Sequence, residues 1–212
     1  MQYTTESRES YMPGLIESNI KFEFPDDFYV SKFDDTAFYR DNVNALNGCK
    51  AIDFVAAGTN RYAFIEVKNC LGDEANNRWR IAPNNSKRDT IPTNHDVSDR
   101  DSLDIEMAQK TASTIAALVG AYSAPTPERN AEECYDVASM LCDEKIHTGE
   151  RKILVILVLD GDFGCQTRND NMIRNGLRQS IEKKLKWLKC TVWVTTSTEF
   201  SDLRLGTASR IA

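Results

Sequence analysis

The sequence predicts one α/β domain built on a central mixed sheet of about five strands flanked by helices. Residues 51–68 have the pattern of two apolar strands joined by a polar turn. Residues 152–160 form an unbroken apolar run, which is typical of a central strand covered on both faces. The segments between and after these strands have the apolar period of helices. A length of 212 residues suits one packed domain, so we expect a single domain over residues 1–212 with its core at about 35–195.

The first predicted elements are short. Residues 20–24 alternate like a strand, and residues 28–33 favour a second strand. A helix is expected from Asp35 or Thr36 to about Leu46, with Phe38, Val43 and Leu46 facing inward. The hairpin of residues 49–70 follows.

Residues 71–100 are polar, and they predict a long loop with a short third strand at about 78–81. A loop of this length in a compact domain is usually either functional or disordered. Two readings stay open, a substrate-facing flap and a mobile surface insertion. A helix is then expected from Asp101 or Ser102 to about Tyr122, and an amphipathic helix over 128–144.

The last elements form a strand–helix–strand unit. The strand at 152–160 precedes a basic amphipathic helix at about 171–188 and a final strand at 191–195. Such a unit requires a right-handed crossover and parallel strands. We expect an irregular tail over residues 198–212.

Composition narrows the class of protein. Hydrophobic residues make up 41% of the chain and charged residues 27%, as in ordinary soluble proteins. No apolar run reaches the ~18 residues of a membrane span, and the N-terminus lacks the features of a secretory signal. We therefore expect a cytoplasmic protein that does not contact membranes. Six cysteines without a C-x-x-C pair, and only two histidines, argue against a zinc site and favour reduced thiols.

The hairpin has an unusual face. If Ala57 faces Tyr62 across the turn, Asp53 lies opposite Glu66, and directly opposed Cβ atoms are roughly 4.5–5.5 Å apart. Lys68 projects from the same face, roughly 6.6 Å along the strand from Glu66. The other face is continuous apolar core. In the same register Cys49 faces Cys70, where two small core residues are favoured over a redox pair.

Two neighbouring buried carboxylates need a cation or a shared proton to compensate their charge. Mg²⁺ or Mn²⁺ suits such an oxygen-only set and keeps several waters, one of which could act as nucleophile. Lys68 could lower the pKa of that water, position it, or neutralise charge on a phosphate. An accidental cluster of ion pairs is the alternative.

Asp53 followed by Glu66-Val67-Lys68 resembles the PD-(D/E)xK nuclease superfamily, although Ile52 stands where the motif has proline. The resemblance implies a restriction-endonuclease-like core, with Asp53 and Glu66 as metal ligands and the Val67 carbonyl as a third. It implies that Lys68 is the catalytic lysine. Members of this superfamily often contribute a Gln or Lys from the next helix, which points to Gln109 and Lys110. Solvent exposure of both is the alternative.

The preferred function is therefore a Mg²⁺- or Mn²⁺-dependent nuclease that acts on DNA more readily than RNA. A second metal would need another acid from a set preceding the hairpin, namely Glu17, Asp34, Asp35 and Asp41. The alternative function is a catalytically silent nuclease-fold module that binds nucleic acid or a protein partner. A homodimer fits either, since many nucleases of this type dimerise. A small-phosphoester enzyme lacks support because no glycine-rich phosphate loop occurs.

The net charge of −6 counts against a protein that coats nucleic acid, but the charge is segregated. Residues 168–189 carry seven Lys or Arg against two acids. A solvated helix face is one explanation, and a track for phosphates is the other. The candidate phosphate-binding residues are Lys87, Arg88, Arg174, Arg178, Lys183, Lys184 and Lys186.

Overall fold

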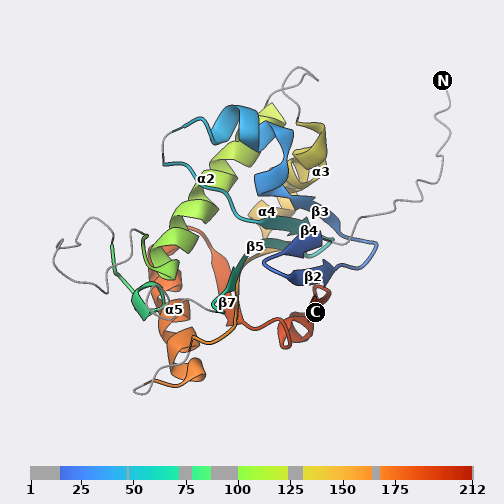
Figure 1. Cartoon of the computed structure of the whole chain (residues 1–212). Coiled ribbons are helices and arrows are strands. Elements are labelled where there is room, and N and C mark those ends of the chain that lie inside the picture. The colour runs from blue at the N-terminus through green and yellow to red at the C-terminus, as the bar shows by residue number, and fades with distance from the viewer. Residues whose placement is uncertain are drawn as a thin grey trace, which may run out of the picture.

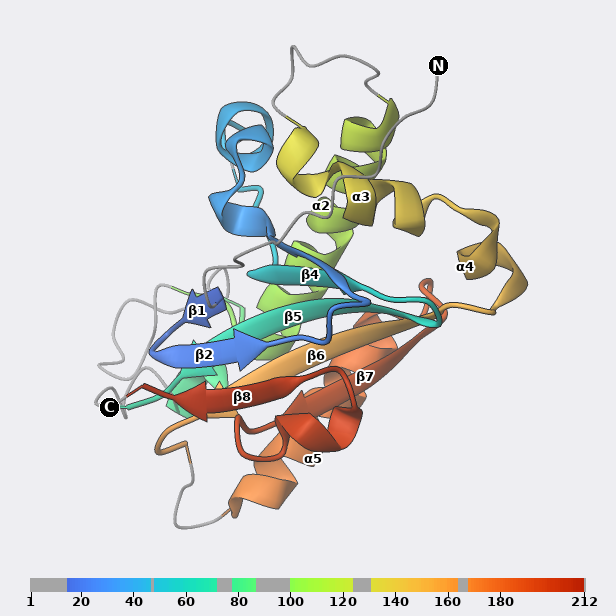
Figure 2. The same cartoon turned by 90° about the vertical axis from the view of Figure 1, so that its right-hand side faces the viewer.

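The fold has three layers: helices, a five-stranded sheet and a small three-stranded sheet (Figures 1 and 2). The structure is a computed structural model that describes residues 15–46, 48–71, 78–86, 100–123, 131–163 and 168–211. The helices cover one face of the large sheet, and the small sheet lies across the other. The predicted α/β class, with a mixed sheet of five strands flanked by helices, is confirmed.

The large sheet has the order β3-β4-β5-β6-β7. Its strands are β3 (Tyr29–Lys32), β4 (Phe54–Ala57), β5 (Arg61–Asn69), β6 (Lys152–Asp160) and β7 (Cys190–Thr195). Neighbours among β3, β4 and β5 are antiparallel, whereas β5, β6 and β7 run parallel. The predicted parallel pairing of the strands at 152–160 and 191–195 is therefore confirmed, and β6 lies between β5 and β7 in the sheet.

The predicted hairpin register is also confirmed. Ala57 pairs with Tyr62 and Phe54 pairs with Ile65. The alternation of side chains follows from this register. Val55 and Phe64 face the helices, while Phe54 and Ile65 face the small sheet. Both faces of the hairpin are consequently buried.

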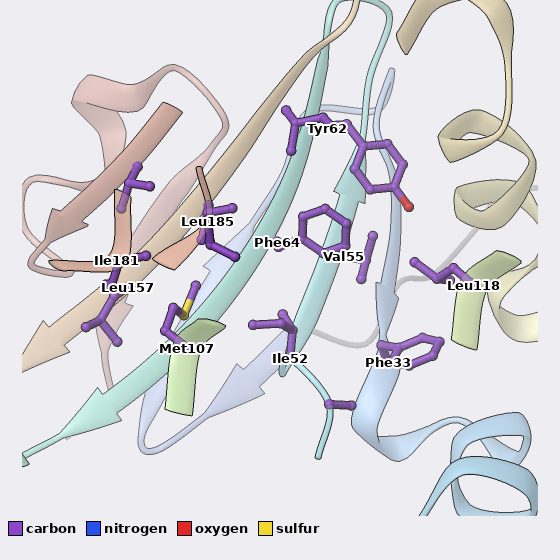
Figure 3. Close-up of a cluster of buried hydrophobic side chains, with 14 of the residues drawn as sticks. Phe33, Ile52, Val55, Tyr62, Phe64, Met107, Leu118, Leu157, Ile181 and Leu185 are labelled. Carbon is purple, nitrogen blue, oxygen red and sulfur yellow. The ribbon is translucent and has the colours of Figure 1, made fainter. Parts of the chain in front are cut away.

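Three helices supply the core on one side of the large sheet. They are α2 (Leu103–Ser123), α3 (Glu132–Leu141) and α5 (Asp170–Lys184), and a short α4 (Glu144–Thr148) leads into β6. Figure 3 shows Met107 and Leu118 of α2 in one cluster with the sheet residues Val55 and Phe64 and with Ile52, which precedes β4. In the same view Ile181 and Leu185 come from the α5 side. The apolar stripes predicted for residues 101–122 and 171–188 thus face the sheet.

The small sheet closes the opposite face. It consists of β1 (Leu15–Glu17), β2 (Ile20–Glu23) and β8 (Thr207–Arg210), all antiparallel. Phe200, in the 3-10 helix η5 (Phe200–Leu203), packs its ring 5.2 Å from that of Phe22. At the end of β6, the buried Asp160 accepts hydrogen bonds from Ser197 and from Arg210 of β8. The C-terminal segment is therefore fixed by packing and by hydrogen bonds.

Three local predictions are wrong. The helix expected at 35–46 is a 3-10 turn, η1 (Phe33–Asp35), followed by a π-helix, η2 (Tyr39–Val43), and Leu46 is exposed. The strand expected at 78–81 is helical at 78–80. The tail expected to be irregular contains η5 and β8, because pairing with β2 gives the last strand its partner. In the long polar loop, residues 72–77 and 87–99 lie outside the described residues.

Within the described ranges, no helix combines the length and the apolar character needed to cross a bilayer.

Replacing Phe200 by Ala should destabilise the protein by about 3–5 kcal/mol, because it empties a fully buried site between the sheets. Urea unfolding followed by circular dichroism measures the change. Ile211→Ala is the matched control, since Ile211 is 45% exposed and its truncation removes little buried surface. Equal stability of the two variants would contradict the packing role of the C-terminal segment.

Candidate metal and catalytic site

Asp53, Glu66 and Lys68 meet on the helix-facing side of the large sheet, beneath α2. Asp53 immediately precedes β4, and the other two residues lie on β5. Asp53 is 4% exposed and Glu66 is 1% exposed. The paired ladder ends at Phe54 and Ile65, so Asp53 and Glu66 are the next residues along the two segments, and Lys110 of α2 lies against both.

Both the side chain and the backbone carbonyl of Asp53 accept hydrogen bonds. Its Oδ2 atom accepts a hydrogen bond of 2.7 Å from the amide of Val67, and its backbone carbonyl accepts one of 3.0 Å from the amide of Phe33. In an antiparallel ladder a residue directs its N–H and C=O to the same side of its strand. The Val67 carbonyl is therefore directed to the side of β5 on which Asp53 lies, and its role as a metal ligand stays a prediction.

Lys110 of α2 completes the pair of carboxylates with a positive charge. Its Nζ atom lies 2.6 Å from Glu66 Oε1 and 3.5 Å from Asp53 Oδ1. Lys68 Nζ lies 2.7 Å from the same Glu66 Oε1. Gln109 precedes Lys110, and adjacent residues of a helix point about 100° apart around its axis. Gln109 is therefore directed away from the site and is exposed. Of the two helix residues implied by the resemblance, only Lys110 reaches the site.

Burial and neighbouring charges shift the pKa values of the groups at this site. Burial, and then the charge of Glu66, raise the pKa of Asp53 to about 7, although Lys110 and Lys68 act against this rise. Burial alone would lower the pKa of Lys110, but the charges of Glu66 and Asp53 raise it above its ordinary value. Near neutral pH, Asp53 is therefore poised between a shared proton and a shared cation.

A second set of charges adjoins the first, and the sequence analysis did not include it. Glu106 of α2 lies one helical turn before Lys110. Its Oε2 atom is 2.5 Å from Nη2 of Arg80, and its Oε1 atom is 3.7 Å from Nζ of Lys50. Lys68 Nζ lies 4.0 Å from the same Oε1. The spacing of Glu106 and Lys110 places both on one helix face, which is the signal that could have identified Glu106.

The pKa of Glu106 reflects these neighbours. Burial alone would raise it, but the charges of Lys68, Arg80, Lys110 and Lys50 lower the pKa to about 2. Glu106 thus stays ionised at any physiological pH, in contrast to Asp53.

The residues present fit a hard divalent cation. Glu66 Oε2 is buried and has no hydrogen-bond partner among the described residues. Such an oxygen is an open acceptor directed into the site. No group of three or more acidic, cysteine or histidine side chains in the described ranges is arranged to hold a metal. One or two carboxylates with waters are the usual protein contribution to a Mg²⁺ site, so this pair is compatible with such an ion, and its binding stays a prediction.

Asp34 is the best placed of the four acids considered for a second metal. Its Oδ1 atom is buried and has no partner within the described part of the chain. Burial, and then the charge of Asp35, raise the pKa of Asp34 to about 6, although the charges of Lys32 and, less strongly, of Lys110 act against this rise. Glu17 and Asp35 instead form ion pairs with Lys32, and Asp41 is exposed.

The basic helix is less available to phosphates than its composition indicates. Its Arg174 pairs with Glu199, Arg178 pairs with Glu182, and Lys184 pairs with the buried Asp104. Lys183 and Lys186 are exposed. Lys87 and Arg88 lie outside the described residues.

Cys49 and Cys70 are not joined by a disulfide, and both pack against the core on the helix side of the sheet. The expectation of small core residues is consistent with this placement.

Residues 36–205 match a protein family described as a family of unknown function, DUF6661. The chain belongs to this family. The matched range contains the hairpin, α2 and the whole parallel unit, and it therefore contains the candidate site. No curated protein and no solved structure matches the chain.

The raised pKa of Asp53 predicts a pH-dependent gain in stability for Asp53→Asn. An ordinary Asp pKa is near 3.8, so native Asp53 holds its proton more tightly than the unfolded chain up to about pH 7. Its contribution to stability therefore falls as the pH rises from about 4 to about 7. In EDTA, we expect Asp53→Asn to melt at least about 3 °C above the wild type at pH 8, and to gain less at pH 5.

Differential scanning fluorimetry across this pH range measures the effect. Asp202→Asn is the matched control, because Asp202 is exposed on η5. A difference between Asp53→Asn and the wild type that does not change with pH would contradict the assignment of a raised pKa to Asp53.

Proposed function

We propose that this protein is a divalent-metal-dependent nuclease that hydrolyses phosphodiester bonds, with a restriction-endonuclease-like core. The observation that carries the proposal is the buried pair Asp53 and Glu66, with one unpartnered carboxylate oxygen and Lys68 beside it. Two like charges in a buried place are costly without a compensating cation. The resemblance of Asp53 and Glu66-Val67-Lys68 to the superfamily motif supports the same reading.

In this proposal Asp53 and Glu66 hold Mg²⁺ or Mn²⁺, with the Val67 carbonyl as a further ligand. The ion supplies Lewis-acid stabilisation of the phosphate and acidifies a bound water. Asp53 is oriented for ligation by the hydrogen bond from the Val67 amide. Since a protonated carboxyl is a poor ligand, the pKa of Asp53 near 7 makes metal binding weaker at lower pH.

Lys68 is the residue that faces both the carboxylates and solvent. Its side chain is 20% exposed, while that of Glu66 is 2% exposed. An ammonium group in this position can orient an attacking water and stabilise negative charge that develops on a phosphate. DNA is preferred to RNA as the polymer because of the resemblance alone.

A second candidate function is a catalytically silent module of the same fold that binds nucleic acid or a protein. Lys110 favours it, because its Nζ lies between the two carboxylates and already compensates them. The two candidates differ in what happens to Lys110. In the nuclease, the metal replaces part of its contact with the carboxylates, and in the silent module Lys110 is the permanent counter-ion.

The nuclease proposal predicts metal-dependent cleavage that depends on the motif residues. We expect cleavage of DNA with Mg²⁺ or Mn²⁺, none in EDTA, and a loss on the order of 10²–10³-fold in Lys68→Ala, because a positioned charge is removed. Asp53→Ala should be at least as impaired. Gel assays on supercoiled, linear and single-stranded DNA, with RNA in parallel, measure the rates.

Lys152→Gln is the control for these assays, since Lys152 is exposed at the opposite end of the parallel strands. Cleavage that survives in Asp53→Ala and Lys68→Ala would show a contaminating enzyme. Absence of cleavage on every polymer, together with absence of Mn²⁺ binding by calorimetry, would favour the silent module.

Replacing Lys110 by Gln separates the two candidates by stability. The change leaves two buried carboxylates with Lys68 as the nearest cation, so in EDTA the melting temperature should fall by roughly 6–15 °C. If the site holds a metal, Mn²⁺ should restore at least half of this loss and should raise the melting temperature of the wild type less. If Mn²⁺ does not raise the melting temperature of Lys110→Gln, the result would show that Lys110 is the permanent counter-ion of the two carboxylates.

A further inference from the structure

Glu106 gathers positive side chains from three separate segments of the chain. Arg80 comes from the helical turn at 78–80, Lys50 precedes β4, and Lys68 lies on β5. All three direct a nitrogen to within 4.0 Å of the Glu106 carboxylate. A single surface ion pair contributes little, but three cations around one buried acid form a network with a fixed geometry.

The side chains of this network differ in how far they are exposed to solvent. The side chain of Glu106 is 7% exposed and that of Arg80 is 11% exposed, whereas Lys50 is 49% exposed. Lys68 lies between these extremes and also contacts Glu66. The Glu106 carboxylate is therefore shielded from solvent, whereas Lys50 is accessible to it. An anion could approach the three cations from the side of Lys50.

Arg80 has one donor atom without an acceptor in the part of the chain that the structure describes. Its Nη2 atom bonds to Glu106, but its Nε atom is buried and has no acceptor among the described residues. A guanidinium presents a planar fork of donors that matches the oxygens of a phosphate. A buried donor without a partner costs free energy, which a ligand oxygen would recover.

The turn that carries Arg80 is fastened to the start of α2. Trp79 Nε1 donates to the carbonyl of Arg100 at 2.9 Å, and the amide of Ser102 donates to the carbonyl of Asn85 at 2.8 Å. The buried Asp104 accepts a hydrogen bond from the Asn84 amide. Arg80 is thus held in place before any ligand arrives, which lowers the entropic cost of binding.

The local charge lacks the acidic excess of the chain. The site combines four cations, Lys50, Lys68, Arg80 and Lys110, with three carboxylates, Asp53, Glu66 and Glu106. These seven groups carry one positive charge when every acid is ionised, and the sum is zero when the nearby Asp34 is counted, while the whole chain carries −6. An anion is therefore repelled less at this place than by the protein as a whole.

We propose that Lys50, Lys68 and Arg80 bind a backbone phosphate of a nucleic-acid strand, and that Glu106 is a positioning residue that holds these three cations together. The choice of polymer rests on the function proposed above. In this proposal the guanidinium of Arg80 and the ammonium groups of Lys68 and Lys50 contact the phosphate, which approaches from the side of Lys50, the most exposed of the three.

The test is metal-free binding of a short fluorescein-labelled single-stranded DNA, followed by anisotropy in EDTA over a range of salt concentrations. Lys50→Gln and Arg80→Gln should each weaken binding at least about fivefold and reduce the salt slope by roughly 0.7, because each removes one phosphate contact. The matched control Lys152→Gln should bind as the wild type does, since Lys152 lies at the opposite end of the parallel strands.

Glu106→Gln distinguishes a positioning role from a simple charge effect. If Glu106 only repels phosphate, its neutralisation should strengthen binding. If it positions the cations, the variant should bind more weakly although it has gained positive charge. Circular dichroism checks that each variant is folded, and Lys50→Gln keeps the test valid should Arg80→Gln unfold, because Lys50 is half exposed.

The outcomes for the two proposals are distinguishable. Binding that depends on Lys50 and Arg80, without cleavage in any metal, would support this inference and contradict the nuclease. Wild-type affinity in both Lys50→Gln and Arg80→Gln would overturn the inference, whether or not the protein cleaves DNA. Tighter binding by Glu106→Gln would overturn the positioning role of Glu106.

Discussion

The structure depends on the compensation of two carboxylates that the fold takes out of water. Asp53 and Glu66 are opposed because of the hairpin register, and they are buried because α2 packs across that face of the sheet. Removal of an ionised carboxylate from water costs several kcal/mol, and this must be offset locally. Lys110 offsets it from α2 and Lys68 from β5, so the same charges join the helix to the sheet.

The two faces of the large sheet therefore have different roles. On the side of the small sheet, the hairpin contributes apolar residues such as Phe54 and Ile65, which pack with Phe22 and Phe200. On the helix side, apolar residues such as Val55 and Phe64 are followed toward the open end of the hairpin by Asp53, Glu66 and Lys68. One face gives the sheet its stability, which leaves the end of the other face available for charges that packing alone would exclude.

The charged residues act as a network rather than as separate pairs. Glu66 shares one oxygen between Lys110 and Lys68, and Lys68 also faces Glu106, which in turn holds Arg80. Effects of substitutions within such a network are not additive. A substitution of Glu106 should therefore also affect Asp53 and Glu66. Among the described contacts, Glu106 is linked to Glu66 through Lys68. This coupling connects the proposed phosphate-binding residues to the proposed metal and catalytic residues.

The sequence by itself determined the hairpin, its register, the central strand β6 and the parallel unit after it, because these depend on periodicity and turn chemistry over short ranges. It also identified Asp53, Glu66 and Lys68, since their faces follow from that register. Only the tertiary structure placed Lys110 in the site, exposed Gln109, and added the cluster of Glu106, Arg80 and Lys50. It also decided the strand β8 and the helical turn at 78–80. The physical reason is range: a side chain's face on its own element is a local property, whereas its partner on another element depends on how distant segments pack.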